Sequence, residues 1–232
     1  MIDLTPLDNP AYTALLGPHA WLAERSGNAV RYPADIAPFA GLPSDPAPDD
    51  WANLGELTGP GGVAATAGVP ADPPDRWQVL RIIESVQLTG EGIAGAPDRE
   101  AITLGPDDVP DMLDLVARTR PGPFLKRTIE FGGYLGIRRG GALIAMAGER
   151  LRPPGWSEIS AVCTDPQFRG QGLASLLTLA VAAAIQARGD TPFLHVMADN
   201  ITAIRLYEQL GFRLRRATVF SAARVPEAQR AR

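Results

Sequence analysis

Apolar residues in the second half of the chain recur in two different periods. Between residues 109 and 119 they are spaced by three and four positions, which predicts an amphipathic helix. In other segments they alternate with polar residues or form short β-branched runs, which predicts strands. The strands expected on this basis cover residues 101–105, 133–139, 142–150, 156–164, 191–199 and 212–220.

Two further helices complete this part of the pattern. Residues 173–188 are apolar on almost every side, which is typical of a helix buried against a sheet. Residues 200–211 begin with Asn200 as an N-cap and end with Gly211 as a terminating glycine. The resulting order, β-α-β-β-β-α-β-α-β, predicts a fold of the α/β (α+β) class.

The first hundred residues give a weaker pattern, because proline and aspartate interrupt residues 30–50. A helix is expected near residues 11–26, and strands are expected in residues 61–68 and 76–90. Residues 90–100 have the composition of a linker. We therefore expect a smaller N-terminal domain over residues 1–98 and a main domain over residues 99–225.

Composition narrows the class of protein. The chain has 232 residues, 45% of them hydrophobic, which is enough for a sizeable core. No apolar run reaches the roughly 18–20 residues that span a bilayer, and the N-terminus lacks the pattern of a signal peptide. A single cysteine, Cys163, excludes an internal disulfide and a cysteine zinc cluster. We expect a cytoplasmic protein without a metal.

The net charge of −4 is unevenly distributed. Residues 1–100 carry 14 acidic and 5 basic side chains, whereas residues 101–232 carry 12 acidic and 17 basic side chains. An acidic half is a poor surface for nucleic acid. A mildly basic half with scattered arginines suits a small phosphorylated ligand.

The stretch Arg169-Gly170-Gln171-Gly172 lies between a predicted strand and the start of the apolar helix. The first amides of a helix lack internal acceptors and form an anion site at the positive end of the helix dipole. The two glycines leave no Cβ to keep a phosphate away, and Arg169 adds positive charge. A pyrophosphate matches this site in size and charge.

The motif Arg169-x-x-Gly172-x-Ala174 after a strand resembles the acetyl-coenzyme-A signature of the GNAT N-acetyltransferases. The downstream segments 198–200 and 203–212 resemble the next two landmarks of that family in order and spacing. The resemblance covers residues 100–222 and is closest to the FR47-like subgroup. It implies a mixed, mostly antiparallel sheet flanked by helices, with residues 1–98 as a degenerate GNAT-like half or a domain of other function.

The resemblance also implies a site for acetyl-CoA as cosubstrate. Main-chain groups of Ser160, Ala161, Val162 and Cys163 would pair with pantetheine on a strand that splays from its neighbour. The amides of residues 169–174 would bind the pyrophosphate, and Asn200 would contact the pantetheine arm. The cofactor-binding residues expected in this way are Ser160, Ala161, Val162, Cys163, Arg169, Gly170, Gln171, Gly172, Leu173, Ala174 and Asn200.

Tyr207 matches the general acid of the family, which protonates the leaving thiolate. Its alternative is a core role, since it belongs to an apolar stripe along its helix. Glu158 and Glu149 are the candidate general bases, and either could instead form an ion pair with Arg150 or Arg152. A water relay is the further alternative.

Other interpretations stay open. A dinucleotide-binding Rossmann site lacks a third glycine, because Ser175 stands at that position. A CoA-binding sensor without turnover is the second rival. Cys163 and His195 are expected to be buried residues without a catalytic role. The expected activity is that of an acyltransferase, with a small-molecule amine or a peptide as acceptor, no nucleic-acid or membrane partner, and a homodimer left open.

Overall fold

The computed structural model describes residues 2–68 and 73–227. Within them, the strands form one sheet in the order β1-β2-β3-β4-β11-β5-β10-β9-β8-β7-β6. In chain order they are β1 (Glu24–Ser26), β2 (Ala29–Arg31), β3 (Phe39–Gly41), β4 (Val63–Ala67), β5 (Gln78–Thr89), β6 (Ile102–Leu104), β7 (Tyr134–Arg139), β8 (Ala142–Glu149), β9 (Trp156–Thr164), β10 (Thr191–Met197) and β11 (Arg213–Arg224).

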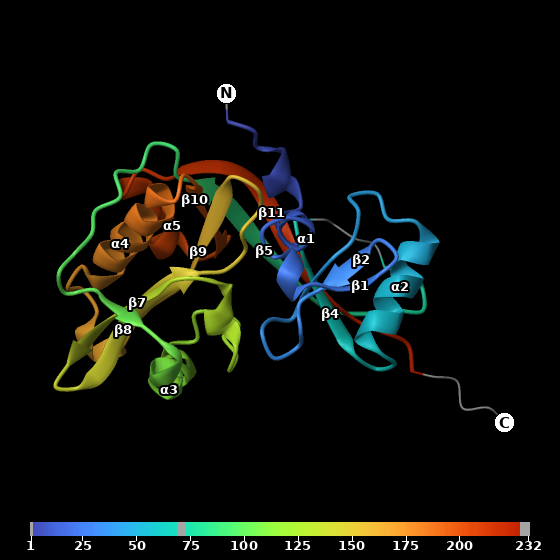
Figure 1. Cartoon of the computed structure of the whole chain (residues 1–232), viewed down its shortest axis with the longest axis horizontal. Coiled ribbons are helices and arrows are strands. Elements are labelled where there is room, and N and C mark those ends of the chain that lie inside the picture. Colours follow the sequence, from blue (N-terminus) through green and yellow to red (C-terminus); the bar gives the residue numbers. More distant parts are fainter. Residues whose placement is uncertain (1, 69–72, 228–232) are drawn as a thin grey trace.

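Helices cover this sheet on both faces (Figure 1). They are α1 (Pro10–Leu16), α2 (Pro48–Thr58), α3 (Val109–Thr119), α4 (Leu173–Ala187) and α5 (Ile201–Gln209). Short 3-10 turns cover Thr5–Asp8, Ala20–Leu22, Pro106–Asp108, Thr128–Phe131 and Pro166–Phe168. Among the helices of the described residues, none is both long and apolar enough to cross a membrane.

The predicted elements of the second half are confirmed. The hairpin of β7 and β8 turns at Gly140 and Gly141, which both have positive φ. Asn200 is the N-cap of α5, since its side chain accepts a hydrogen bond from the Ala203 amide at 3.1 Å. The fold class is confirmed as well, because most strand pairs in the described residues are antiparallel, and only β3–β4 and β9–β10 among them are parallel.

The first half differs from the prediction in two places. The helix expected near residues 11–26 ends at Leu16, because Gly17 and Pro18 cannot continue it, and β1 follows. Helix α2 lies where proline and aspartate suggested irregular structure. Pro48 occupies its first turn, where no amide hydrogen is needed, and Asp50 accepts a hydrogen bond from the Ala47 amide at 2.9 Å.

The strand expected in residues 76–90 is β5, and it lies in the centre of the sheet. It pairs with β10 on one side and with β11 on the other. Figure 1 shows β5 and β11 running together from the half with α4 and α5 to the half with α2. The boundary expected near residue 98 falls after β5, so strands from both sides of it share one sheet.

The segment predicted as a linker has no regular element but packs on α4. Its Ala96 amide donates to the Leu179 carbonyl at 3.0 Å, and the Gln186 amide group donates to the Ile93 carbonyl at 2.9 Å. Ile93 belongs to the same apolar cluster as Leu177 of α4. These contacts hold residues 90–100 against the main body of the molecule.

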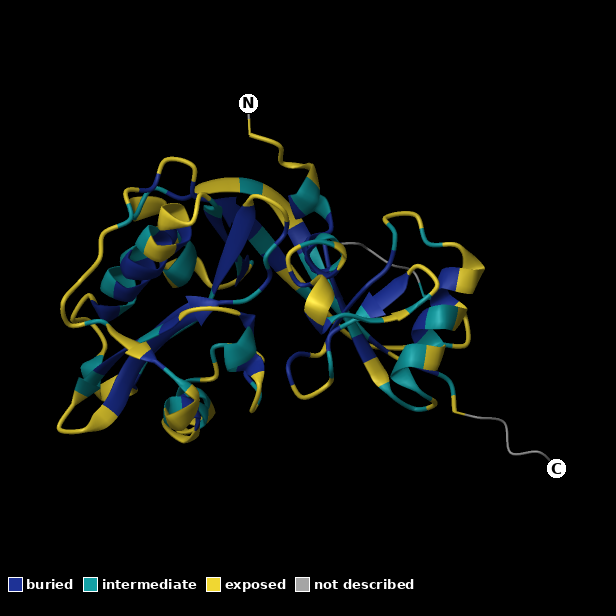
Figure 2. Ribbon diagram, viewed as in Figure 1, coloured by how far each residue is buried: buried dark blue, intermediate teal, exposed yellow. Residues whose placement is uncertain are grey.

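The apolar core lies on both faces of the sheet, as the dark strands in Figure 2 show. On one face, α4 packs on β7, β8, β9 and β10 through residues such as Leu177, Ile159 and Leu194. On the other face, α3 covers β7 to β9, and the N-terminal segment with α1 covers Trp156 and Phe193. Strand β9 is therefore covered by α4 on one face of the sheet, and by α3 and the N-terminal segment on the other.

Candidate active site

Strands β9 and β10 run parallel but pair only where they begin. Residues 191–193 of β10 lie opposite residues 156–158 of β9. From Leu194 onward, the pairs formed by β10 within the described structure are with β5, and those of β9 are with β8. The two strands therefore separate into a gap. Its narrow end is the pair Glu158–Phe193, and its facing main-chain edges are free.

A β-bulge changes the orientation of the main chain of β9 where this strand borders the gap. Between two shared pairs, β9 has two residues, Ala161 and Val162, opposite a single residue of β8. Ala161 has a φ of 54°, a left-handed conformation that costs an L-residue about 1–2 kcal/mol. Ile159 and Val162 pack on the α4 side, whereas Ala161 and Cys163 pack on the α3 side. The bulge thus reverses the alternation of the strand.

A row of free main-chain amides lies between the wide end of the gap and α4. Gly170 and Gly172 both have a φ of +77°, and no atom lies within 4 Å of the place where a Cβ would be. Gly172 caps α4 without a side-chain hydrogen bond. Within the described structure, the amides of residues 170–174 have no hydrogen-bond acceptor. This arrangement is an open anion site at the positive end of a helix.

The loop that carries these amides is held in place from its beginning. The Asp165 carboxylate accepts a hydrogen bond from the Gln167 amide at 2.9 Å and forms an ion pair with Arg118 of α3. The Arg169 side chain donates from Nε to the Thr164 carbonyl at 3.3 Å, so its charge lies beside the loop. The buried Thr164 hydroxyl has no partner in the described structure. The site is therefore largely formed before any ligand binds.

Tyr207 lies on α5 and joins the cluster between α4 and the sheet, with 8% of its surface exposed. Burial, reinforced by the neighbouring Cys163 thiol, raises its pKa above the ordinary value. Its ring lies edge-to-face against Phe212, with the ring centroids 5.9 Å apart. The side chain is thus both a core residue and a phenol that stays neutral at ordinary pH.

Glu158 is at the narrow end of the gap, where basic side chains hold its carboxylate. It is fully buried, and its carboxylate accepts hydrogen bonds from Arg150 at 2.6 and 2.9 Å and from His195 Nδ1 at 2.6 Å. Burial alone would raise its pKa, but Arg150 and His195 outweigh it and lower the pKa to about 2. A carboxylate of this basicity is a poor proton acceptor. The ion pair with Arg150, the alternative expected from sequence, is present.

Glu149 lies on the opposite face of the sheet from Glu158. Its carboxylate accepts hydrogen bonds from the Ser157 hydroxyl at 2.6 Å and from the Gly133 amide at 3.2 Å. It also forms an ion pair with Arg188, the C-cap residue of α4. These contacts tie the end of α4 to the sheet. The structure does not bring the two expected bases together.

The residues expected to be passive are buried. Burial raises the pKa of the Cys163 thiol to about 11, which leaves it unreactive. The His195 side chain is 3% exposed and lies between Glu158 and Gln87. Among residues 2–68 and 73–227, no three His, Cys, Asp or Glu side chains are grouped so that they could hold a metal ion.

Sequence reasoning missed the bulge and the partners of His195. The bulge residue is alanine, so no glycine signals its left-handed conformation. Gln87 lies in β5, a strand far away in the sequence, and no local pattern indicates that it contacts β10. Both features become visible only when the pairing of β9 with β8 and of β10 with β5 is known.

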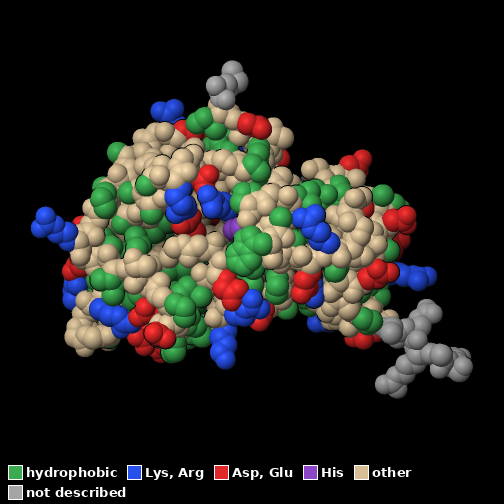
Figure 3. All heavy atoms as spheres, in the orientation of Figure 1, with side chains coloured by type: hydrophobic (Ala, Val, Ile, Leu, Met, Phe, Trp, Pro, Cys, Tyr) green, Lys and Arg blue, Asp and Glu red, His purple; other side chains and the backbone are tan. Residues whose placement is uncertain are grey.

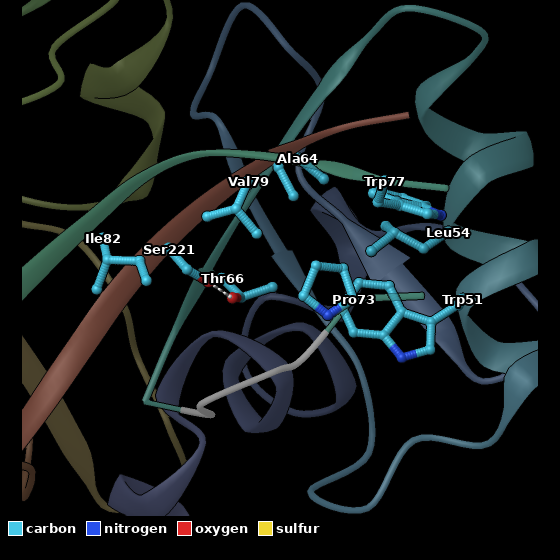
Figure 4. A pocket seen from close by; sticks show the side chains of 10 residues that line it. Trp51, Leu54, Ala64, Thr66, Pro73, Trp77, Val79, Ile82 and Ser221 are labelled. Atoms are coloured by element: carbon cyan, nitrogen blue, oxygen red, sulfur yellow. Dashed lines mark hydrogen bonds between the residues drawn. The ribbon is translucent and has the colours of Figure 1, made fainter. Parts of the chain in front are cut away.

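The visible surface offers two further observations. Figure 3 shows acidic and basic side chains intermixed over the face in view, without a continuous basic field. Figure 4 shows an apolar hollow beside α2, away from the gap. It is lined by Trp51, Leu54, Ala64, Thr66, Pro73, Trp77, Val79, Ile82, Ser221 and Ala223. None of its lining residues belongs to β9, β10 or the amide loop.

Comparison with known proteins agrees with this geometry. The family model of FR47-like proteins matches residues 134–221. A solved structure from Novosphingobium aromaticivorans, described as an acetyltransferase of the GNAT family, is 39% identical and has a TM-score of 0.87. The match covers 97% of this chain and 99% of that one. The chain therefore belongs to the GNAT N-acetyltransferase family.

Curated relatives match over shorter stretches. The mycothiol acetyltransferase of Thermomonospora curvata is 30% identical over 160 residues, which is 68% of this chain and 47% of that protein. The N-alpha-acetyltransferase RimI of Mycobacterium tuberculosis is 37% identical over 82 residues, 34% of this chain and 51% of that protein. The chain thus spans about half the length of these relatives.

Proposed function

We propose that this protein transfers an acetyl group from acetyl-CoA directly to a primary amine of a small molecule or peptide. The observation that carries the proposal is the position of the free amides of residues 170–174 beside the gap between β9 and β10. The amides can bind a diphosphate, and the gap can hold an extended pantetheine arm. Together they match the two ends of a CoA molecule, and family membership supports this interpretation.

The residues present fit this cosubstrate. The open space at Gly170 and Gly172 admits a phosphate to the amides. The free edge of β9 at residues 160–163 offers main-chain groups for the amides of pantetheine, and Asn200 at the end of β10 borders the same gap. When bound, acetyl-CoA supplies an activated acetyl thioester.

Tyr207 is the proposed general acid. Its pKa is raised by burial, so it is protonated at neutral pH and can donate to the departing sulfur. Tyr207→Phe is expected to keep CoA affinity and to lower turnover by about 100-fold. Unchanged turnover would remove Tyr207 from the mechanism.

The incoming amine loses its proton through a water relay in this proposal. Both candidate carboxylates, Glu158 and Glu149, are held in ion pairs, so neither is carried forward as the base. This same observation favours the second candidate function, a CoA-binding sensor without turnover. Release of free thiol from acetyl-CoA, measured with a panel of amines, separates the two functions.

The amine panel follows from the relatives. One is named for mycothiol and the other for an alpha-amino group, so the panel contains small amines of both kinds and short peptides. Acetyl-dependent thiol release with at least one amine supports transfer. Tight CoA binding with no release for any amine supports the sensor, and no binding at millimolar CoA contradicts both.

A further inference from the structure

A buried polar network crosses the gap at its narrow end. Glu158 of β9 accepts a hydrogen bond from His195 Nδ1 of β10 at 2.6 Å, and His195 Nε2 lies 3.0 Å from the Gln87 amide nitrogen of β5. The Gln87 carbonyl oxygen accepts from Arg215 of β11 at 2.7 Å. The network thus joins the four adjacent strands β11, β5, β10 and β9, and Arg150, which follows β8, holds Glu158 at its end.

The hydrogen bonds of Gln87 determine which tautomer of the His195 imidazole fits this network. The Gln87 amide nitrogen donates to the Leu7 carbonyl at 2.9 Å, while its oxygen accepts from Arg215. The same nitrogen therefore donates its second hydrogen to His195 Nε2, which must be an acceptor. The proton of the neutral imidazole is then on Nδ1 and points at Glu158. His195 has no free nitrogen left to take a proton from a substrate.

The position of this contact is the informative feature. Main-chain pairing of β9 and β10 ends at Glu158 and Phe193, and His195 is two residues further along β10. The side-chain contact thus lies beyond the last main-chain pair, where the strands begin to separate. Arg150 holds Glu158 from the other side and stacks over Phe39 at 5.1 Å, so the carboxylate cannot swing away.

We propose that the Glu158–His195 contact is a positioning clamp that fixes where β9 and β10 part, and so limits how deeply an acyl group enters the gap. The proposal rests on the proposed function, because it assumes that an acyl-CoA occupies the gap. Neither residue touches the reacting atoms in this account. The clamp closes the narrow end and favours an acetyl group over longer acyl groups.

Two substitutions of His195 separate the clamp from a general structural role. The side-chain nitrogen of His195→Asn reaches the place of Nδ1 and can still donate to Glu158, but it cannot reach Gln87. The longer His195→Gln places its amide near Nε2 and can bind Gln87 but not Glu158. Each variant loses one buried hydrogen bond of the same ring, so each is the other's control.

The experiment measures kcat/KM with acetyl-CoA and with butyryl-CoA for both variants and the wild type. The ratio of butyryl to acetyl activity is expected to rise about tenfold in His195→Gln, the size of one hydrogen bond to a charged group. It is expected to stay within about twofold of the wild type in His195→Asn. Equal ratios in the two variants would overturn the clamp.

Amide hydrogen exchange on the free protein keeps the test independent of activity. His195→Gln is expected to speed exchange of the Ser157, Thr191 and Phe193 amides relative to His195→Asn, because the last pairs of β9 and β10 lose the contact that closes them. Equal exchange in both variants would also overturn the clamp. If wild-type protein ignores CoA but the exchange difference is present, the proposed function fails while the clamp on the strands stands.

Discussion

Replacing Gly172 by alanine tests the amide site, and a second glycine at the opposite end of α4 provides a control. Gly172 precedes α4 with a φ of +77°, and Gly189 follows α4 with a φ of +84°. Neither has an atom within 4 Å of the place of a Cβ. Gly172→Ala and Gly189→Ala therefore impose the same kind of backbone strain at opposite ends of α4. Only the first places a methyl group over the free amides.

The two variants are expected to lose similar stability. A left-handed alanine costs about 1–2 kcal/mol, and the reduced entropy of the unfolded chain returns about 0.4–1 kcal/mol. Each variant should thus lose about 1 kcal/mol in urea unfolding. Their CoA affinities should differ more. Each charge-assisted hydrogen bond between an amide and a phosphate is worth about 1.5–3 kcal/mol, or about tenfold to hundredfold in Kd.

Titration calorimetry with CoA measures this difference. Gly172→Ala should weaken binding at least about tenfold, whereas Gly189→Ala should bind like the wild type. If both variants bind CoA equally well, the amides beside Gly172 do not bind the diphosphate. If both variants bind CoA equally weakly, the effect comes from strain in α4 and not from a methyl group that blocks the phosphate from the amides.

Three further predictions concern the bulge at Ala161, the buried His19 and the loop that carries the free amides. Ala161→Val should lower the unfolding free energy by about 1–2 kcal/mol more than Ala161→Gly, because a β-branched residue resists the left-handed conformation; urea unfolding of both variants measures it, and equal stabilities would contradict it. Burial, with the charge of Arg152, lowers the pKa of His19 from 6.5 to about 4, so the unfolded chain binds a proton that the folded chain does not. Stability should fall by about 1.4 kcal/mol per unit as pH drops from 6.5 to 4, and His19→Gln should lack this slope. Arg118→Ala should weaken CoA binding without abolishing it, because it frees the anchor Asp165 but removes no amide; calorimetry that shows no change would separate the anchor from the site.

The second half of the fold could be predicted because each of its elements carries a local signal. The period of α3, the glycine pair of the β7–β8 hairpin and the cap Asn200 all act within a few residues. Helix α2 carried such a signal too, since Pro48 and Asp50 are typical of a helix start. The many prolines and aspartates nearby hide this signal, because they are equally typical of irregular structure.

The candidate site could be predicted only in part. The glycines of the amide loop act through their own backbone, so their pattern indicates their position directly. The state of Glu158 depends on Arg150 and His195, which reach it from neighbouring strands. Ion pairs between neighbouring strands leave no periodic pattern of residues in the sequence. For this reason the residue type predicts a base, whereas the surroundings of Glu158 favour the positioning role that we propose.

Amide NMR during a CoA titration is the most direct test of the central claim. The account predicts saturable shifts that are largest for the amides of residues 170–174, accompanied by shifts along residues 160–163 of β9. Shifts concentrated at the apolar hollow beside α2, or no shifts at millimolar CoA, would contradict it.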